Sequence, residues 1–183
     1  MAILNKAVFL DRDGVLNKPI VRDRKPYAPS VISDFLIYPE AERALKKLRS
    51  RGFLLLVVTN QPDLATGVLH KDELDKMHNS LMNCLPITEI YVCPHSRRDD
   101  CLCRKPRSGL IEIGIKNFGL DVNSSWMIGD RYSDIVAGLS AGLNTIFIDR
   151  NYAETPVNTT AGYVVESLVQ AVDTLLENTK LYR

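Results

Sequence analysis

The chain has 183 residues, of which 45% are hydrophobic and 25% charged, and its formal net charge is +1. This length and composition are typical of one globular domain with its own core, so we expect a single domain over residues 1–183. The near-neutral charge and the lack of a sustained Lys/Arg block argue against nucleic acid or an anionic membrane as a partner. A small ligand is the better expectation, and we expect the protein to be a monomer.

The N-terminal segment does not have the pattern of a signal peptide. It carries charge at Lys6, Asp11, Arg12 and Asp13 and lacks a long apolar stretch with a small-residue cleavage site. No other segment approaches the roughly 20 apolar residues needed to span a bilayer. We therefore expect a cytoplasmic protein whose cysteines are thiols or metal ligands rather than disulfides.

Short, saturated apolar runs alternate along the chain with longer segments of helical period. In chain order, we expect a strand at 7–10, a helix that begins at Pro39 and is ended by Gly52, a strand at 53–58, a helix at 74–85, a strand at 90–93, a helix at 108–118, a strand at 126–128, a helix at 133–141, a strand at 145–148 and a helix at 168–176. Strands saturated with apolar residues are buried on both faces, as in parallel sheets. The alternation therefore predicts a doubly wound, mainly parallel α/β fold of the Rossmann-like type.

Two stretches interrupt this alternation. The first lies between Asp11 and Pro39. Within it, residues 20–24 have an alternating pattern and are flanked by prolines, so they are expected to form a small hairpin that covers a site as a flap. The second lies between Cys93 and Pro106 and is too polar and too rich in proline for a helix or strand. Neither the flap segment nor the segment after the second strand is long enough to hold a separate cap domain.

Polar side chains that suit phosphate chemistry follow four of the predicted strands. Asp11 and Asp13 follow the first strand, Thr59, Asn60 and Gln61 the second, Lys105 the polar loop after the third, and Asp130, Arg131 and Asp134 the fourth. Ligands of an open α/β sheet bind at the carboxyl ends of its strands, so we expect these residues to converge. A lone pair of acids after a strand is often a solvated turn, but this ordered set at four strand ends favours an active site.

Phosphoryl transfer needs a nucleophile, a proton donor and donors around the transferring oxygens. Asp11 is the expected nucleophile because its position at a strand end fixes its line of approach. Asp13 is expected to protonate the leaving oxygen and later to deprotonate the attacking water. Thr59, the backbone of Asn60, and Lys105 are expected to neutralise the equatorial phosphate oxygens.

The acidic residues also predict a magnesium site, because Mg²⁺ prefers hard oxygen ligands. Asp11, Asp130 and the backbone carbonyl of Asp13 are expected to hold the ion, with Asp134 orienting its water ligands. Gly14, directly after Asp13, is expected to allow a tight turn there.

The polar loop predicts a second metal site. Its candidate ligands are Cys93, His95, Cys101 and Cys103. Three thiolates and one imidazole are the ligands of a closed, tetrahedral structural zinc site, and the C-x-H and C-x-C spacings let each pair bind from one turn of loop. The remaining cysteine, Cys84, is expected to be a small core residue on a helix, and His70 and His78 are assigned no role.

The stretches DRDGVLN, VVTNQ, CRKP and IGDRYSDI resemble the four motifs of the haloacid dehalogenase superfamily of phosphatases. The resemblance extends across most of the chain. It implies that Asp11 is phosphorylated, that Asp13 is the general acid and base, that Thr59 and Lys105 hold the phosphoryl group, and that Asp130 binds magnesium.

The polar loop, with its predicted zinc ligands directly before RKP, narrows the resemblance to one subgroup. This subgroup contains D-glycero-D-manno-heptose 1,7-bisphosphate phosphatases and histidinol-phosphate phosphatases. The stretch NQPDLATG is similar to the NQSGIARG type of segment in that subgroup and departs from it at Pro62, Asp63 and Thr66. The resemblance implies removal of the 7-phosphate of the heptose bisphosphate, in the synthesis of nucleotide-activated heptose for lipopolysaccharide or capsule.

The substrate contacts expected from the sequence are Asn60, Gln61, Arg104 and Arg131, with Arg22 or Arg24 of the flap as further candidates for a second phosphate. Three alternatives stay open. They are a histidinol-phosphate phosphatase, a zinc-stabilised binding module without catalysis, and a nucleic-acid 3′-phosphatase. The last is disfavoured because the chain has no basic stripe with interleaved aromatic residues.

Overall fold

The computed structural model describes residues 5–153 and 161–179. Within them, six strands form one sheet in the order β5-β4-β1-β6-β7-β8, and its neighbouring strands run parallel. Their bounds are β1 Lys6–Leu10, β4 Phe53–Asn60, β5 Glu89–Cys93, β6 Trp126–Gly129, β7 Asn144–Ile148 and β8 Tyr163–Val165. The chain extends the sheet from β1 first to one side and then to the other, which confirms the predicted doubly wound α/β fold.

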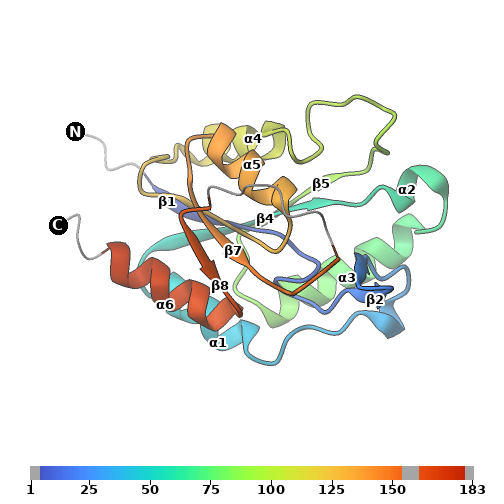
Figure 1. The fold of residues 1–183 in the computed structure, drawn as a ribbon, viewed down its shortest axis with the longest axis horizontal. Helices are drawn as coiled ribbons and strands as arrows, with labels where there is room; N and C mark the ends of the chain where they lie inside the picture. The colour runs from blue at the N-terminus through green and yellow to red at the C-terminus, as the bar shows by residue number, and fades with distance from the viewer. Residues whose placement is uncertain (1–4, 154–160, 180–183) are drawn as a thin grey trace.

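Helices cover both faces of this sheet (Figure 1). They are α1 Ala41–Arg49, α2 Asp63–Thr66, α3 Lys71–Cys84, α4 Gly109–Phe118, α5 Tyr132–Ser140 and α6 Leu168–Asn178, with a short 3₁₀ helix, η1, at Ile32–Asp34. The helices α1, α3 and α6 lie on one face, and α4 and α5 lie on the other. No helix in residues 5–153 and 161–179 has the length and hydrophobicity needed to cross a lipid bilayer.

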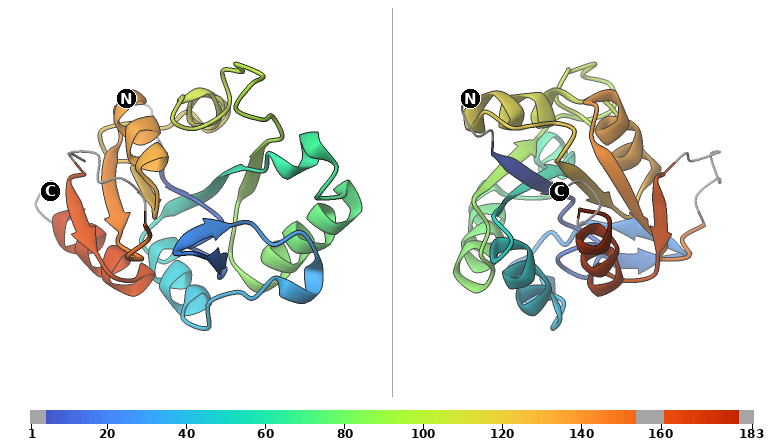
Figure 2. Two further views of the ribbon diagram at one scale, coloured as in Figure 1. Left: turned by 45° about the vertical axis from the view of Figure 1, so that its right-hand side comes forward. Right: turned by 90° about the vertical axis from the view of Figure 1, so that its left-hand side faces the viewer.

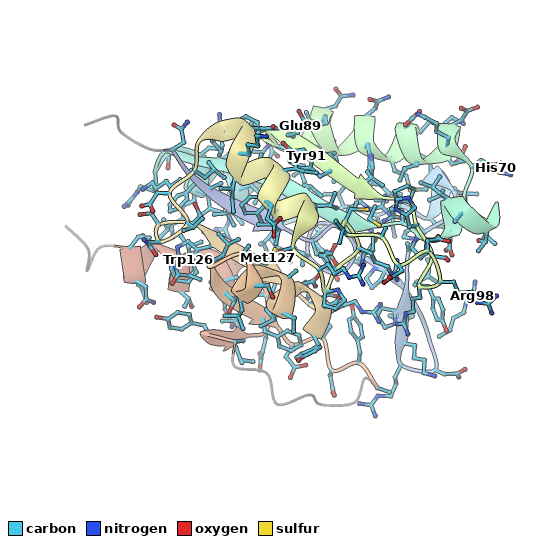
Figure 3. All side chains as sticks on the ribbon, turned by 90° about the horizontal axis from the view of Figure 1, so that it is seen from above. His70, Glu89, Tyr91, Arg98, Trp126 and Met127 are labelled. Atoms are coloured by element: carbon cyan, nitrogen blue, oxygen red, sulfur yellow. The ribbon has the colours of Figure 1, made fainter. Side chains whose placement is uncertain are left out.

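Each face of the sheet has its own apolar core, because successive side chains of a strand point to opposite faces. On β6, Trp126 packs into the core beneath α1, α3 and α6, and Met127 packs into the core beneath α4 and α5 (Figure 3). Two filled cores hold the strands rigidly. Their carboxyl ends therefore form a fixed platform for side chains.

Several details of the elements differ from the sequence-based expectation. The helix α1 begins at Ala41 after the N-cap Glu40, so Pro39 precedes the helix instead of opening it. The strand β5 is a partly exposed edge strand and is not buried on both faces. The short strand β8 and the single-turn helix α2 were not predicted. β8 is an apolar stretch of only three residues that is largely exposed, and α2 has only four residues.

The predicted flap is present as an antiparallel hairpin of β2 Ile20–Arg22 and β3 Lys25–Tyr27. Asp23 and Arg24 form its two-residue loop, and both have positive φ, as a tight hairpin turn requires. The hairpin lies across the carboxyl ends of the central strands (Figure 2). Between β1 and β4 the chain otherwise forms only η1 and α1, so no cap domain is inserted there.

Candidate active site

A cavity of about 1070 Å³ opens at the carboxyl ends of the strands, between the flap and the polar loop that follows β5. Of the residues predicted from the sequence, it is lined by Asp11, Asp13, Thr59, Asn60, Arg104, Lys105, Arg131 and Asp134. These side chains come from the ends of β1, β4 and β6 and from the loop after β5. The structure thus brings together most of the residues that the strand-end argument selected, whereas Gln61 and Asp130 are not among the residues that line the cavity.

Lys105 lies between two carboxylates at the floor of this cavity. Its Nζ is 2.8 Å from Oδ1 of Asp11 and 2.7 Å from Oδ1 of Asp134, and it donates to the carbonyl of Val58 at 2.7 Å. Burial alone would lower the pKa of Lys105, but the Asp11 and Asp134 carboxylates raise it above its ordinary value. The ammonium group therefore stays charged and is placed to neutralise a phosphoryl oxygen.

Asp11, the expected nucleophile, is buried at the end of β1. Burial raises the pKa of Asp11 to about 7, and the Lys105 ammonium opposes that rise. The nearby Asp134 and Asp13 carboxylates add to the increase. The environment of Asp11 is therefore unfavourable for its negative charge unless a further cation is present.

Asp130 completes a buried cluster of acids with Asp11 and Asp134. One carboxylate oxygen from each of the three lies within 4.8 Å of the others. Neither oxygen of Asp130 has a hydrogen bond of normal geometry within the described part of the chain, and burial with the two neighbouring carboxylates raises the pKa of Asp130 well above its usual value. Buried carboxylate oxygens of like charge suit a small divalent cation, so these residues fit Mg²⁺.

Asp134 was expected only to orient the water ligands of the ion, but its carboxylate belongs to the acidic cluster itself. Its Oδ2 accepts from the backbone N–H of Arg131, the N-cap residue of α5, at 3.0 Å. This bond leaves Oδ1 facing Lys105 and the cluster. The start of α5 thus fixes the orientation of a carboxylate in the site.

Gln61 was expected to contact substrate, but it lies behind the cavity wall. Its side chain is fully buried, and among the described residues it is not part of the cavity wall. Its Nε2 donates to Oγ1 of Thr59 at 2.8 Å and to Oδ2 of Asp13 at 2.9 Å. Gln61 is therefore placed to orient two site residues from behind.

Asn60 has a second function besides lining the cavity. Its Nδ2 donates to the Lys105 carbonyl and its Oδ1 accepts from the Lys105 N–H, both at 3.1 Å. This reciprocal pair joins the end of β4 to the segment that carries Lys105. It fixes the backbone from which the Lys105 side chain reaches Asp11.

The arginines divide into two groups. Arg104 and Arg131 line the cavity, and Nη1 of Arg104 donates to the carbonyl of His95 at 3.1 Å. Of the described flap residues, Lys25 lines the cavity but Arg22 and Arg24 do not. Arg24 instead donates to the carbonyl of Asn151 at 3.2 Å, and Arg22 lies over the ring of Tyr27. Arg22 and Arg24, the flap candidates for a second phosphate, are therefore directed away from the cavity.

The predicted zinc ligands gather in the polar loop. They are Cys93, His95, Cys101 and Cys103, and their ligand atoms lie 3.2 to 3.6 Å apart in the five pairs that are in contact. Four ligands of a tetrahedral zinc ion, with Zn–S bonds of about 2.3 Å, are separated by roughly 3.8 Å. The cluster is slightly tighter than this, and its donor set fits zinc. Cys84, in contrast, is exposed at the end of α3, so its expected place in the core is wrong.

The two histidines without an assigned role differ. His70 is the exposed N-cap residue of α3 and lies at the outer surface of the molecule (Figure 3). His78 lies further along α3 and is partly buried, and its Nε2 is 3.2 Å from Nη1 of Arg12. Arg12 itself sits between Asp11 and Asp13 in the sequence and is fully buried. Sequence reasoning missed this pair, although an arginine between two catalytic acids was a visible signal.

Known proteins resemble this chain over most of its length. A family model described as HAD-hydrolase-like matches residues 102–171. The chain is 35% identical to the D-glycero-alpha-D-manno-heptose-1,7-bisphosphate 7-phosphatase of Photorhabdus laumondii, over 78% of this chain and 81% of the relative. It is 34% identical to the D-glycero-beta-D-manno-heptose-1,7-bisphosphate 7-phosphatase of Pasteurella multocida, over 90% of this chain and 94% of the relative.

Two further likenesses bear on the choice of substrate. The chain is 33% identical to the histidine biosynthesis bifunctional protein HisB of Blochmanniella floridana, over 78% of this chain but 40% of that protein. Its fold matches a D,D-heptose 1,7-bisphosphate phosphatase from B. bronchiseptica, solved with magnesium and phosphate, with a TM-score of 0.82 and 25% identity over 94% of this chain and 99% of that one. With the four strand-end motifs gathered around one cavity, these likenesses show that the chain belongs to the haloacid dehalogenase superfamily of phosphatases.

Proposed function

We propose that this protein removes the 7-phosphate of D-glycero-D-manno-heptose 1,7-bisphosphate through an aspartyl-phosphate intermediate on Asp11. The product would serve the synthesis of nucleotide-activated heptose. The observation that carries the proposal is the placement of Lys105 between Asp11 and Asp134 at the floor of the cavity. The names of the most similar relatives support the choice of substrate.

The reaction has two steps, which are formation and then hydrolysis of the aspartyl-phosphate on Asp11. In the first, a carboxylate oxygen of Asp11 forms a bond to phosphorus, the bond from phosphorus to the sugar oxygen breaks, and Asp13 gives its proton to that oxygen. In the second, water attacks the phosphorus, Asp13 takes a proton from the water, and Asp11 is released with inorganic phosphate. Lys105 and Thr59 hold the phosphoryl oxygens throughout.

Magnesium fits the acidic cluster described above. Asp11, Asp130 and the backbone carbonyl of Asp13 are the proposed ligands, and Asp134 stands beside them. When bound, the ion would neutralise negative charge on the transferring phosphoryl group. The solved phosphatase from B. bronchiseptica, which contains magnesium and phosphate, supports this proposal. Removal of divalent cations with EDTA should therefore abolish phosphate release, and added Mg²⁺ should restore it.

Zinc is the proposed occupant of the cluster of Cys93, His95, Cys101 and Cys103. Such a site has no open position for substrate, so its role is to hold the loop. The loop leads directly into Arg104 and Lys105. Its stability therefore determines where the phosphate-binding ammonium group lies.

The zinc cluster predicts a specific effect of one thiol. Replacing Cys101 by serine should lower the bound zinc by more than half and reduce kcat/KM about tenfold, because the loop no longer holds Lys105 in place. Elemental analysis and phosphate release measure the two quantities. Cys84→Ser, which changes an exposed thiol outside the cluster, is the matched control. Equal zinc content in the two variants would contradict the assignment.

Arg104 is proposed to bind the second phosphate of the substrate. It lines the cavity beside Lys105, and a guanidinium can hold a phosphate through two charge-assisted hydrogen bonds. Asn60 and Arg131 line the same cavity and are proposed as further contacts. A monophosphate with a cationic amine, such as histidinol phosphate, would gain little from this guanidinium.

Arg104→Ala should therefore weaken turnover of the bisphosphate more than that of a monophosphate. A lost charge-assisted contact of this kind is worth about 1.5 to 3 kcal/mol, or roughly ten- to a hundredfold in kcat/KM. Arg98→Ala is the matched control, because Arg98 belongs to the same loop but points outward (Figure 3). Equal losses for both kinds of substrate would show that Arg104 does not distinguish the second phosphate.

A histidinol-phosphate phosphatase is the second candidate, favoured by the likeness to the HisB protein. A panel of the α- and β-heptose bisphosphates and histidinol phosphate, each with Mg²⁺, separates the candidates by kcat/KM. We expect a clear preference for a heptose bisphosphate. Preference for histidinol phosphate would reverse the assignment, and failure to release phosphate from any of them would favour the binding module.

A further inference from the structure

Arg12 is the largest side chain that is completely buried in the described part of the chain. It does not reach the cavity, although it stands between Asp11 and Asp13 in the sequence. Its Nε and Nη2 lie 3.0 to 3.2 Å from both carboxylate oxygens of Asp13. One face of the Asp13 carboxylate is therefore held by a planar fork of donors, which fixes its direction as well as its distance.

The rest of the guanidinium is held from the opposite side. Its carbon lies 5.4 Å from the ring centre of Phe35, which follows η1, and its Nη1 lies 3.2 Å from Nε2 of His78 on α3. Arginine has only donors, so Nε2 of His78 must accept, and the imidazole is neutral with its proton on Nδ1. Burial and the Arg12 charge lower the pKa of His78 to about 4, which agrees with a neutral ring.

These contacts connect the helix α3 to the catalytic acid Asp13. His78 is fixed by α3, Arg12 is fixed by His78 and Phe35, and Asp13 is fixed by Arg12. The other two donors to Asp13 are the amides of Asn17 and Gln61, each at 2.9 Å. Burial of a guanidinium is unfavourable unless its nitrogens are paired, and here Nε and Nη2 are paired with Asp13 and Nη1 is paired with His78.

We propose that Arg12 and His78 are positioning residues that hold the Asp13 carboxyl group where it exchanges a proton with the leaving oxygen. This proposal rests on the proposed phosphatase function. Neither residue touches the substrate. Their effect therefore passes through Asp13 and is confined to the proton transfer, in which the P–O bond to the alcohol breaks as that oxygen gains the Asp13 proton.

The proton transfer can be isolated by comparing two leaving groups. The 7-phosphate of the heptose bisphosphate and the phosphate of histidinol phosphate are alkyl esters, whose departing alkoxide needs protonation. p-Nitrophenyl phosphate releases a stable phenolate, which needs little protonation to depart. In a reaction with a phosphoenzyme, kcat/KM covers the steps up to departure of the alcohol, so it reports this proton transfer without the later hydrolysis.

The variants for this comparison are His78→Phe, which keeps the ring volume but removes the acceptor, and Arg12→Met, which removes the guanidinium. We expect kcat/KM for the alkyl ester to fall about three- to tenfold in the first and about ten- to a hundredfold in the second. The value for p-nitrophenyl phosphate should change less than about twofold in His78→Phe. His78→Gln, whose amide oxygen can accept from Arg12, should recover most of the lost activity.

His70→Ala is the matched control, because His70 lies exposed at the start of the same helix. Equal losses on the two esters would overturn the proposal, since they would show a general disturbance of the site and not of proton transfer. Unchanged activity of a folded His78→Phe protein on the alkyl ester would overturn it as well. If the unaltered protein hydrolyses neither kind of ester with Mg²⁺, the proposed function fails first, which is a separate outcome.

Discussion

Replacing Asp11 by asparagine is expected to lower phosphate release at least about 10³-fold, because an amide is a poor nucleophile and carries no charge for the metal. The fold should survive the change. Asparagine has nearly the same volume, and its amide oxygen can still accept from the Lys105 ammonium that lies 2.8 Å from Oδ1 of Asp11. Thermal unfolding should therefore stay within a few degrees of the unaltered protein.

Trapping of the intermediate tests the same prediction directly. Rapid acid quenching during turnover should leave one phosphoryl group on Asp11, detectable by the mass of the peptide that carries it, and no such peptide in Asp11→Asn. Asp173→Asn is the control, because Asp173 forms a half-exposed surface ion pair with Lys47. Near-normal phosphate release by Asp11→Asn would rule out the covalent step.

Gly14→Ala is expected to have the second largest effect, through the magnesium site. Gly14 has a φ of +93°, and a Cβ at this position would overlap the carboxylate of Asp130. The carbonyl of Gly14 also accepts from Nε of Arg150 at 2.9 Å, so this turn cannot easily move away. The substitution must displace Asp130 from the acidic cluster. We expect at least about a hundredfold lower kcat at a fixed Mg²⁺ concentration, with partial recovery as Mg²⁺ is raised.

Gly119→Ala separates this effect from backbone strain. Gly119 caps α4 with a φ of +57°, but a Cβ there meets no atom within 4 Å. Both substitutions carry the left-handed penalty of about 1–2 kcal/mol, which thermal unfolding measures. The loss of activity and the changed Mg²⁺ dependence should appear in Gly14→Ala alone. A similar loss in Gly119→Ala would mean that strain, and not displacement of Asp130, causes it.

The parts of the site that the sequence predicted share one physical property. Asp11 and Asp130 each follow a buried parallel strand and Thr59 lies near the end of another, and parallel strands bring their carboxyl ends to one edge of the sheet whatever the rest of the chain does. The zinc cluster was predictable for a related reason. Its members lie within eleven residues, so local spacing alone brings them together.

The contacts that the sequence did not reveal join distant positions. Gln61 reaches Asp13 across 48 positions, and His78 reaches Arg12 across 66. Nothing local to Gln61 indicates whether its amide faces the cavity or the space behind Thr59. The contact between Asp130 and Gly14 also joins distant positions. The sequence shows a glycine at a turn, but it does not show that the Asp130 carboxylate fills the space where a Cβ would lie.

By itself, then, the sequence determined the doubly wound α/β fold, the acids at the strand ends and the cluster of three cysteines and one histidine in the polar loop. Each of these follows from periodicity or short spacing, which act within a few residues along the chain. Only the tertiary structure decided that Gln61 lies behind the site, that Arg22 and Arg24 turn away from the cavity, and that His78 of α3 contacts the arginine that pairs with Asp13. These outcomes depend on how helices and the flap pack against the finished sheet, and packing between distant segments leaves no periodic pattern in the sequence.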